Sequence, residues 1–166
     1  MTLARINLLL ALLVAGLVLA VILLDAPGPG DTSLLTGHAP AEVRHIRIER
    51  RGRDTLAFVR DDDGWRMTAP GAAPAIADRL DAIARILSAA SRRSFPAAEA
   101  DLQELGLAPA RLSLWLDRIR LDIGGTDPIN HRRYLLIGDR VHLIDDLYQH
   151  HLAGPADAFI AGPESP

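Results

Sequence analysis

Residues 43–67 read VRHIRIERRGRDTLAFVRDDDGWRM, and their pattern predicts how the larger part of the chain begins to fold. Apolar and polar residues alternate at its start, with Ile46 and Ile48 as the expected inward pair, which is the pattern of a half-buried strand. The glycine-containing turn at 50–53 leads to a second strand, and the aspartate-rich turn at 61–64 leads to a third. The sequence therefore predicts a three-stranded antiparallel meander.

The next segment changes to helical spacing. Apolar residues recur from Ile76 to Leu87 at intervals of three and four, which predicts a helix that continues to about Ser91. A second, shorter helix is expected from 97 or 98 to 105, with Gly106 as its C-terminal cap. The rest of the pattern predicts four more strands, at 112–116, 119–123, 134–137 and 141–144, and a last short helix at 146–152.

These elements together predict an α+β fold. The domain is expected over residues 42–160, built from antiparallel β-meanders of about seven strands with two to three helices. Its length suits a single hydrophobic core. The tail at 161–166 is expected to be frayed.

The N-terminal stretch predicts a membrane anchor. Residues 8–24 read LLLALLVAGLVLAVILL, an unbroken apolar run, and residues 6–24 would span about 29 Å as a helix. A cleavable signal peptide has a shorter apolar core and a small-residue cleavage site, so a retained transmembrane helix within residues 1–24 is favoured over cleavage.

The charges around this run predict its orientation. Arg5 precedes it and Asp25 and Asp31 follow it, and basic flanks stay cytoplasmic. The expected location is therefore the bacterial inner membrane, with one span, a cytoplasmic N-terminus and a periplasmic C-terminal domain. Residues 25–41 are rich in Pro and Gly and are expected to form a flexible linker.

The composition argues against several classes of function. The 18 basic residues are all arginine and are spread among 21 acidic ones, giving a net charge of −3, whereas a nucleic-acid-binding protein gathers basic residues on one face. Cysteine is absent, which removes disulfides, thiolate metal sites and cysteine nucleophiles. Neither nucleic acid nor a metal is an expected partner.

The polar clusters of the sequence lack the spacing that catalysis or metal binding requires. The run Asp61–Asp63 is better explained as a hairpin turn than as a calcium loop, because position 12 of such a loop would be Ala72. The adjacent His150 and His151 would point in different directions on a helix. Asp145 and Asp146 are interpreted as a helix cap and its neighbour. We therefore expect no catalytic, cofactor-binding or metal-binding residues, and no enzyme.

Three further features have both a structural and a functional interpretation. The glycines at 124–125 are interpreted as part of a wide hairpin turn, and Trp65 and Trp115 as core or sheet-face aromatics. The polar loop 126–133 (TDPINHRR) is the place where contact with a partner is most plausible, since Arg132 and Arg133 could meet an acidic surface or lipid phosphates. A solvated loop is the simpler explanation.

Several short motifs occur in an order that resembles a bacterial family, domain of unknown function 4340. The match covers roughly residues 43–159, nearly the whole predicted domain. The motifs are Trp65-x-Met67-x-x-Pro70, the helix with Asp78 and Leu80, Asp101-Leu102-x-x-Leu105-Gly106-Leu107-x-Pro109, Leu121-x-Ile123-Gly124 and Arg133-Tyr134. The sequence departs from the family by its single, short copy and by Leu105, where an aromatic residue often precedes Gly-Leu.

The resemblance implies a membrane-anchored envelope protein, in some members linked to auxiliary subunits of ABC-type transporters of the gliding-motility kind, and it brings no catalytic residues. Three functions follow as hypotheses. The first is a non-enzymatic accessory or scaffold module that binds another envelope protein, with membrane lipid as a second partner of the N-terminal helix. The second is an auxiliary subunit of an ABC-type transport or export complex, and the third is an envelope hydrolase.

Overall fold

A computed structural model describes residues 10, 12–14, 16–17 and 35–162 of the chain. The chain divides into two units, residues 1–31 and 32–166, and each is described by itself. In the first unit the six described residues are helical, and their side chains are exposed. The second unit carries the sheet.

No helix among the described residues is both long enough and apolar enough to cross a bilayer. On this finding the predicted transmembrane anchor was wrong, together with the single-pass topology and the inner-membrane location with a periplasmic domain. An apolar run satisfies the hydropathy of a span, but a span also needs about 20 continuous helical residues. Residues 6–9, 11, 15 and 18–24 of the predicted helix lie outside the described residues.

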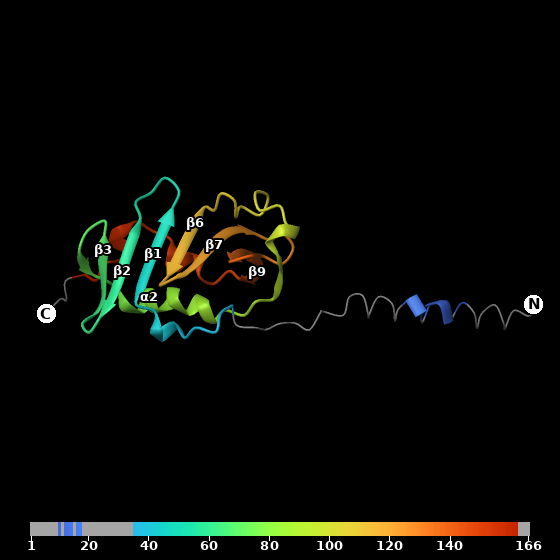
Figure 1. Cartoon of the computed structure of the whole chain (residues 1–166), viewed down its shortest axis with the longest axis horizontal. Helices are drawn as coiled ribbons and strands as arrows, with labels where there is room; N and C mark the ends of the chain where they lie inside the picture. The colour runs from blue at the N-terminus through green and yellow to red at the C-terminus, as the bar shows by residue number, and fades with distance from the viewer. Residues whose placement is uncertain (1–9, 11, 15, 18–34, 163–166) are drawn as a thin grey trace, which may run out of the picture. The chain divides into compact units, whose positions relative to one another are not determined.

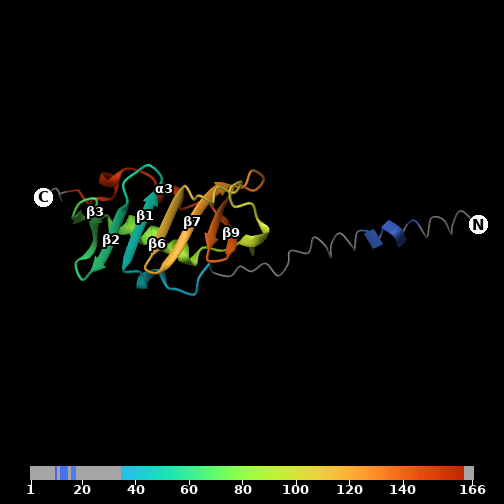
Figure 2. The same cartoon turned by 45° about the horizontal axis from the view of Figure 1, so that its top comes forward.

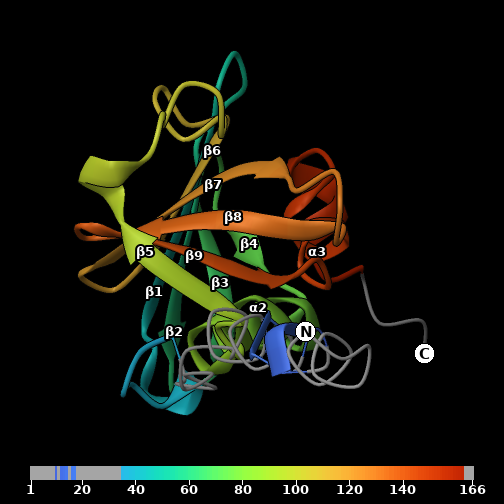
Figure 3. The ribbon, with the colours of Figure 1, turned by 90° about the vertical axis from the view of Figure 1, so that its right-hand side faces the viewer.

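Within residues 35–162, one antiparallel sheet of nine strands dominates the fold. Its strand order is β4-β3-β2-β1-β6-β7-β8-β9-β5, and every neighbouring pair is antiparallel. Figure 3 shows how strongly the sheet twists, since β1 and β2 cross the direction of β8, β9 and β5. The strands are β1 (His45–Arg50), β2 (Leu56–Asp61), β3 (Gly64–Ala69), β4 (Ala73–Pro74), β5 (Arg93–Pro96), β6 (Leu112–Leu116), β7 (Ile119–Thr126), β8 (Arg132–Ile137) and β9 (Arg140–Asp145).

The hairpins lie where the local sequence predicts them. Ile46 and Ile48 are buried, as the alternation predicted. Asp61 pairs with Gly64 across the β2–β3 turn, where the Asp61 side chain accepts a hydrogen bond from the Asp63 amide at 3.0 Å and Gly64 has φ +110°. The predicted hairpin turn is therefore confirmed.

One face of the sheet is covered by α2 (Ala77–Ala84) and the following 3-10 turn η2 (Arg85–Ser88). Figures 1 and 2 show this helix crossing behind β1 and β6. It buries the apolar residues that alternate along the strands, and Phe58 meets Phe159 with ring centroids 5.5 Å apart. The largest fully buried side chains are those of Phe58, Phe159, Ile46, Ile48, Leu56, Met67, Leu80, Ile83, Ile86, Leu87, Leu114 and Leu116.

The C-terminal segment of the domain returns to the sheet. It comprises the short helix α3 (Gln149–Leu152) and the 3-10 turn η4 (Ala156–Phe159). Its backbone then runs beside β4, where the Ile76 amide donates to the Phe159 carbonyl and the Ala161 amide to the Pro74 carbonyl, at 2.9 and 3.0 Å. This pairing covers the edge of the sheet at β4.

The predicted α+β fold class was wrong, because the described residues form mainly one nine-stranded sheet with little helix. The sheet is single and has two strands more than expected, because β4 and β5 lie in segments for which the sequence predicted no strand. The predicted helix at 97–105 is instead the 3-10 turn η3 (Ala97–Glu99) followed by turns, with Gly106 at φ +69°. β5, directly before this segment, pairs with β9, and the Asp101 side chain accepts hydrogen bonds from the amides of Gln103 and Glu104, so local turns replace the weak helical spacing.

Candidate functional site

A pocket of about 330 Å³ opens between one end of the sheet and the segment from Tyr148 to Gly154. Figure 3 shows α3 beside the ends of β8 and β9. Residues of all three elements line the pocket. We call it the arginine pocket. Its lining residues are Arg50, Arg51, Arg53, Ile86, Arg111, Leu112, Ile123, Gly124, Arg133, Leu135, Ile144, Asp145, Asp146, Tyr148, Gln149, Leu152, Ala153 and Gly154.

The floor of the arginine pocket is apolar because of the strand register. Arg50 is paired with Leu112, Leu112 with Ile123, and Ile123 with Leu135, so one row crosses β1, β6, β7 and β8. Residues in such a row share one face of the sheet. The row therefore begins with a cation and continues with three aliphatic side chains.

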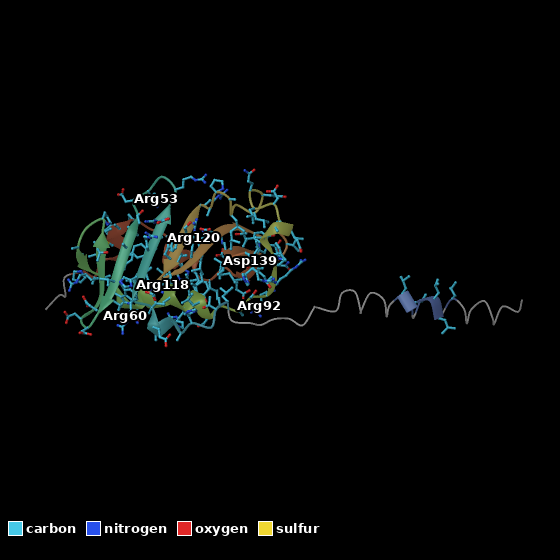
Figure 4. The ribbon with its side chains drawn as sticks, viewed as in Figure 1. Arg53, Arg60, Arg92, Arg118, Arg120 and Asp139 are labelled. Atoms are coloured by element: carbon cyan, nitrogen blue, oxygen red, sulfur yellow. The ribbon has the colours of Figure 1, made fainter. Side chains whose placement is uncertain are left out.

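The rim of the arginine pocket is cationic. Arg50, Arg51 and Arg53 belong to the end of β1 and the turn that follows it, Arg111 precedes β6, and Arg133 lies on β8. The lining holds five arginines against two aspartates. Figure 4 shows Arg53 at the β1–β2 turn, at the opposite end of the strands from Arg118.

Internal pairs neutralise one side of the rim. Arg133 donates to Asp146 at 2.6 Å and to the Gly124 carbonyl at 2.9 Å, and its side chain is 15% exposed. Asp145 pairs with Arg92 at 2.8 Å and with Arg132 at 3.8 Å. The lining aspartates are thus occupied.

The other side of the rim keeps its charge. Within residues 35–162, no carboxylate lies within ion-pair distance of Arg50, Arg51, Arg53 or Arg111. Clustered cations of this kind raise the local concentration of anions.

Arg50 is the most constrained of these cations. One terminal nitrogen donates to the Gly154 carbonyl. Its Nε is buried and has no hydrogen-bond partner among the residues that the structure describes. Burial lowers the pKa of Arg50, and the charges of Arg53 and Arg79 lower it further. Since an arginine stays protonated in proteins, Arg50 is a partly buried charge, and its Nε–H has no acceptor among the described residues.

The chemistry of the arginine pocket follows from this lining. Charged guanidinium groups bind carboxylates and phosphates through paired hydrogen bonds. The aliphatic floor favours an apolar group. Tyr148 stays protonated at neutral pH, because burial raises the pKa of its phenol. The pocket can therefore bind a group that is anionic at one end and apolar at the other.

The loop 126–133, which the sequence singled out for partner contact, contributes to two surfaces. Arg133 lines the arginine pocket, as described. Arg132 faces a different hollow, of about 450 Å³, together with Asp127 and the 82% exposed Ile129. His131 is exposed and has φ +54°.

The remaining polar clusters of the sequence stay apart from the arginine pocket or serve the fold. Trp65 is buried and donates from its indole nitrogen to Asp81 at 2.9 Å. Trp115 is half-buried between Arg47 and Arg120, whose guanidinium carbons lie 4.8 and 5.5 Å from its ring centroid. No group of three or more potential ligands in the described ranges is placed to hold a metal ion.

The glycines at 124–125 lie within β7, at a shift of its register with β8, and not in a hairpin turn. A side chain at Gly124 would meet the Leu105 carbonyl at 2.4 Å. The glycine therefore allows the loop before β6 to pack against β7. Its own carbonyl accepts the bond from Arg133.

The rim arginines at 50–53 and Arg111 were missed as site residues. Residues 50–53 read RRGR and were interpreted as a turn, although three arginines in four residues are more than a turn requires. That density was the available signal. The sequence around Arg111 carries no such signal, because only the tertiary structure brings this residue to the rim.

No model of a known protein family matches the chain, and no curated protein or solved structure matches it. The resemblance to the domain of unknown function 4340 family stays a prediction.

Proposed function

We propose that this chain is a non-enzymatic accessory module that binds a partner protein through the arginine pocket. The observation that carries the proposal is the cationic rim of Arg50, Arg51, Arg53 and Arg111 beside an aliphatic floor. Arginines around an apolar depression are typical of the residues that contribute most to protein interfaces. The partner segment would carry at least one acidic group and one apolar group.

The charge distribution favours a protein over a nucleic acid. The chain carries a net charge of −3, and Asp145 and Asp146 lie in the wall of the arginine pocket. A phosphate backbone would meet these carboxylates, whereas a single carboxylate beside an aliphatic side chain need not. A short protein segment therefore fits the charges of the lining better.

The test is crosslinking and affinity capture of the tagged full chain in its cells, with two double variants. The first, Arg53→Glu with Arg111→Glu, reverses exposed charges on the rim. The matched control, Arg44→Glu with Arg118→Glu, makes the same change in charge at the other end of the strands, where both residues are exposed. We expect one partner that is captured by the native chain and the control and is lost with the rim variant.

Equal capture by both variants would contradict the proposal, since the change in net charge is identical. The captured interaction should also weaken as salt is raised, because the rim charges are exposed and screened. Circular dichroism and thermal unfolding establish that both variants are folded before capture is compared.

A further inference from the structure

The row that begins at Arg50 places a cation and apolar side chains one strand apart. Arg50 is paired with Leu112 and Leu112 with Ile123, on three adjacent strands. Neighbouring strands lie about 4.8 Å apart. A ligand that reaches both ends of this arrangement must carry its negative charge within a few ångströms of its apolar group.

The Nε of Arg50 specifies the charged end. It is buried, and none of the described residues accepts its hydrogen. Leaving a buried charged donor without an acceptor costs free energy, so the guanidinium group would gain by turning its Nε toward a carboxylate that enters the pocket. The arginine fork presents Nε and a terminal nitrogen side by side, which matches the two oxygens of a carboxylate.

The walls of the arginine pocket favour the end of a chain over its middle. Its inner surface is closed by Ile86, Leu135, Ile144 and Leu152, which are all buried. A chain that continued past this point would have to turn back within a volume of about 330 Å³. A chain that ends there needs no exit.

Covalent geometry also favours a terminus. The last residue of a protein carries its carboxylate and its side chain on the same carbon atom. In an extended chain, by contrast, neighbouring side chains point to opposite faces. An internal aspartate and an adjacent leucine would therefore not reach the same row of the sheet together.

We propose that the group that enters the arginine pocket is the C-terminal carboxylate of the partner protein, held by Arg50, with the last aliphatic side chain on the partly exposed Leu112 and Ile123. The inference rests on the proposed function, since it names the part of the partner that is recognised. An internal acidic side chain is the competing occupant.

Three small probes separate these occupants. N-acetyl-leucine represents a chain terminus, N-acetyl-leucinamide has the same shape without the charge, and N-acetyl-aspartate N-methylamide represents an internal acid. Each is titrated into the isotopically labelled full chain, and the methyl signals of Ile123 and Leu135 are followed by NMR. We expect N-acetyl-leucine to bind at least about tenfold more tightly than either of the others, since a charge-assisted hydrogen bond is worth that factor or more.

The variant Arg50→Lys tests the role of the Nε atom. Lysine keeps the positive charge but lacks the planar fork, so the affinity for N-acetyl-leucine should fall about tenfold, while that for the amide stays unchanged. The matched control is Arg118→Lys, at an exposed residue at the opposite end of the strands from Arg53 and outside the arginine pocket. It should bind all three probes as the native chain does.

The proposal would be overturned if the protein bound N-acetyl-leucine and N-acetyl-leucinamide equally well, or if it bound the internal-acid probe more tightly. It would also be overturned if N-acetyl-leucine at millimolar concentration did not shift the methyl signals of the pocket floor. The comparison among probes uses the native chain and does not depend on how a variant folds. If a partner is captured only when Arg53 and Arg111 are intact, but the probes give one of these contrary results, then recognition of a terminal carboxylate is wrong and the proposed function still holds. If partner capture does not depend on Arg53 and Arg111, the proposed function itself is wrong.

Discussion

Two arginines hold the same C-terminal segment, and their surroundings differ. Arg79, on α2, donates to the carbonyls of His150, His151, Ala153 and Ala158, and its guanidinium carbon lies 4.0 Å from the centroid of the Phe159 ring. We call this arrangement the Arg79 clamp. Arg50, at the end of β1, donates to the next carbonyl along, that of Gly154.

The difference lies in how far the protein itself satisfies each guanidinium group. The Arg79 clamp uses all three nitrogens of its guanidinium group on the backbone of the segment. Arg50 leaves its Nε without an acceptor in the described part of the chain. A buried donor that is satisfied contributes to stability, whereas one that is not satisfied costs stability and needs another explanation.

Removal of the Arg79 clamp should have the largest effect on stability. We expect Arg79→Met to lower the free energy of unfolding by about 2–4 kcal/mol, since several carbonyls lose a charged donor. Urea unfolding measures this change. Arg85→Met is the matched control, because Arg85 is exposed on the following turn, and its effect should stay within about 0.5 kcal/mol. Equal losses in the two variants would show that the clamp stabilises nothing.

The wall of the arginine pocket should depend on packing behind the sheet. In Gly124→Ala the new methyl would lie 2.4 Å from the Leu105 carbonyl oxygen and 2.9 Å from Leu107, so we expect a loss of about 1–3 kcal/mol in unfolding free energy. Gly125→Ala is the control, since its methyl would lie 3.5 Å from the same oxygen. Thermal unfolding of the two variants should separate them, and matching curves would argue against the close approach.

Replacement of Arg50 should cost little. Arg50→Met loses the bond to Gly154 but also removes a buried charge with an unused donor, so the unfolding free energy should change by less than about 1 kcal/mol. Measured in the same urea series, a loss as large as that of Arg79→Met would abolish the distinction between the two arginines.

Acid should weaken the clamp region. Burial lowers the pKa of His151, and the charges of His150, Arg79 and Arg85 lower it further. The unfolded chain therefore binds this proton more readily, so stability is complete above the unfolded value of about 6.5 and falls as pH drops below it. The effect should be the smallest of the four.

Unfolding at pH 7.5 and 5.5 measures this dependence, which His151→Gln should reduce. His38→Gln, at an exposed position, serves as the control and should leave the difference unchanged. A native chain that gained stability on acidification through this range would contradict the sign.

The elements that local sequence predicts are those closed by short turns. The hairpins β1–β2–β3, β6–β7 and β8–β9 follow from alternation and two-residue or glycine-containing turns. The short strands β4 and β5 are defined by their partners β3 and β9, and neither has a pattern of its own. A sequence argument sees alternation but not long-range pairing.

The arginine pocket was harder to predict from the sequence than the short strands β4 and β5. It is assembled from the β1–β2 turn, the residues around β6, β7 and β8, and the α3 segment. Each contributor is ordinary alone: a basic turn, an aliphatic strand or a short helix. The combination depends on the register of Arg50 with Leu112, which no single segment encodes.

The distance along the chain between Arg50 and Gly154, 104 residues, has a consequence for how the molecule folds. β1 must also pair with β6, and the Arg44 amide bonds to Asp117 across 73 residues. Such remote contacts require long loops to close, and the entropy lost in closing them is not offset until the contacts form. Chains of this topology therefore fold on the order of milliseconds to seconds. We therefore expect the hairpins to form first and the arginine pocket to be completed when the C-terminal segment reaches the sheet.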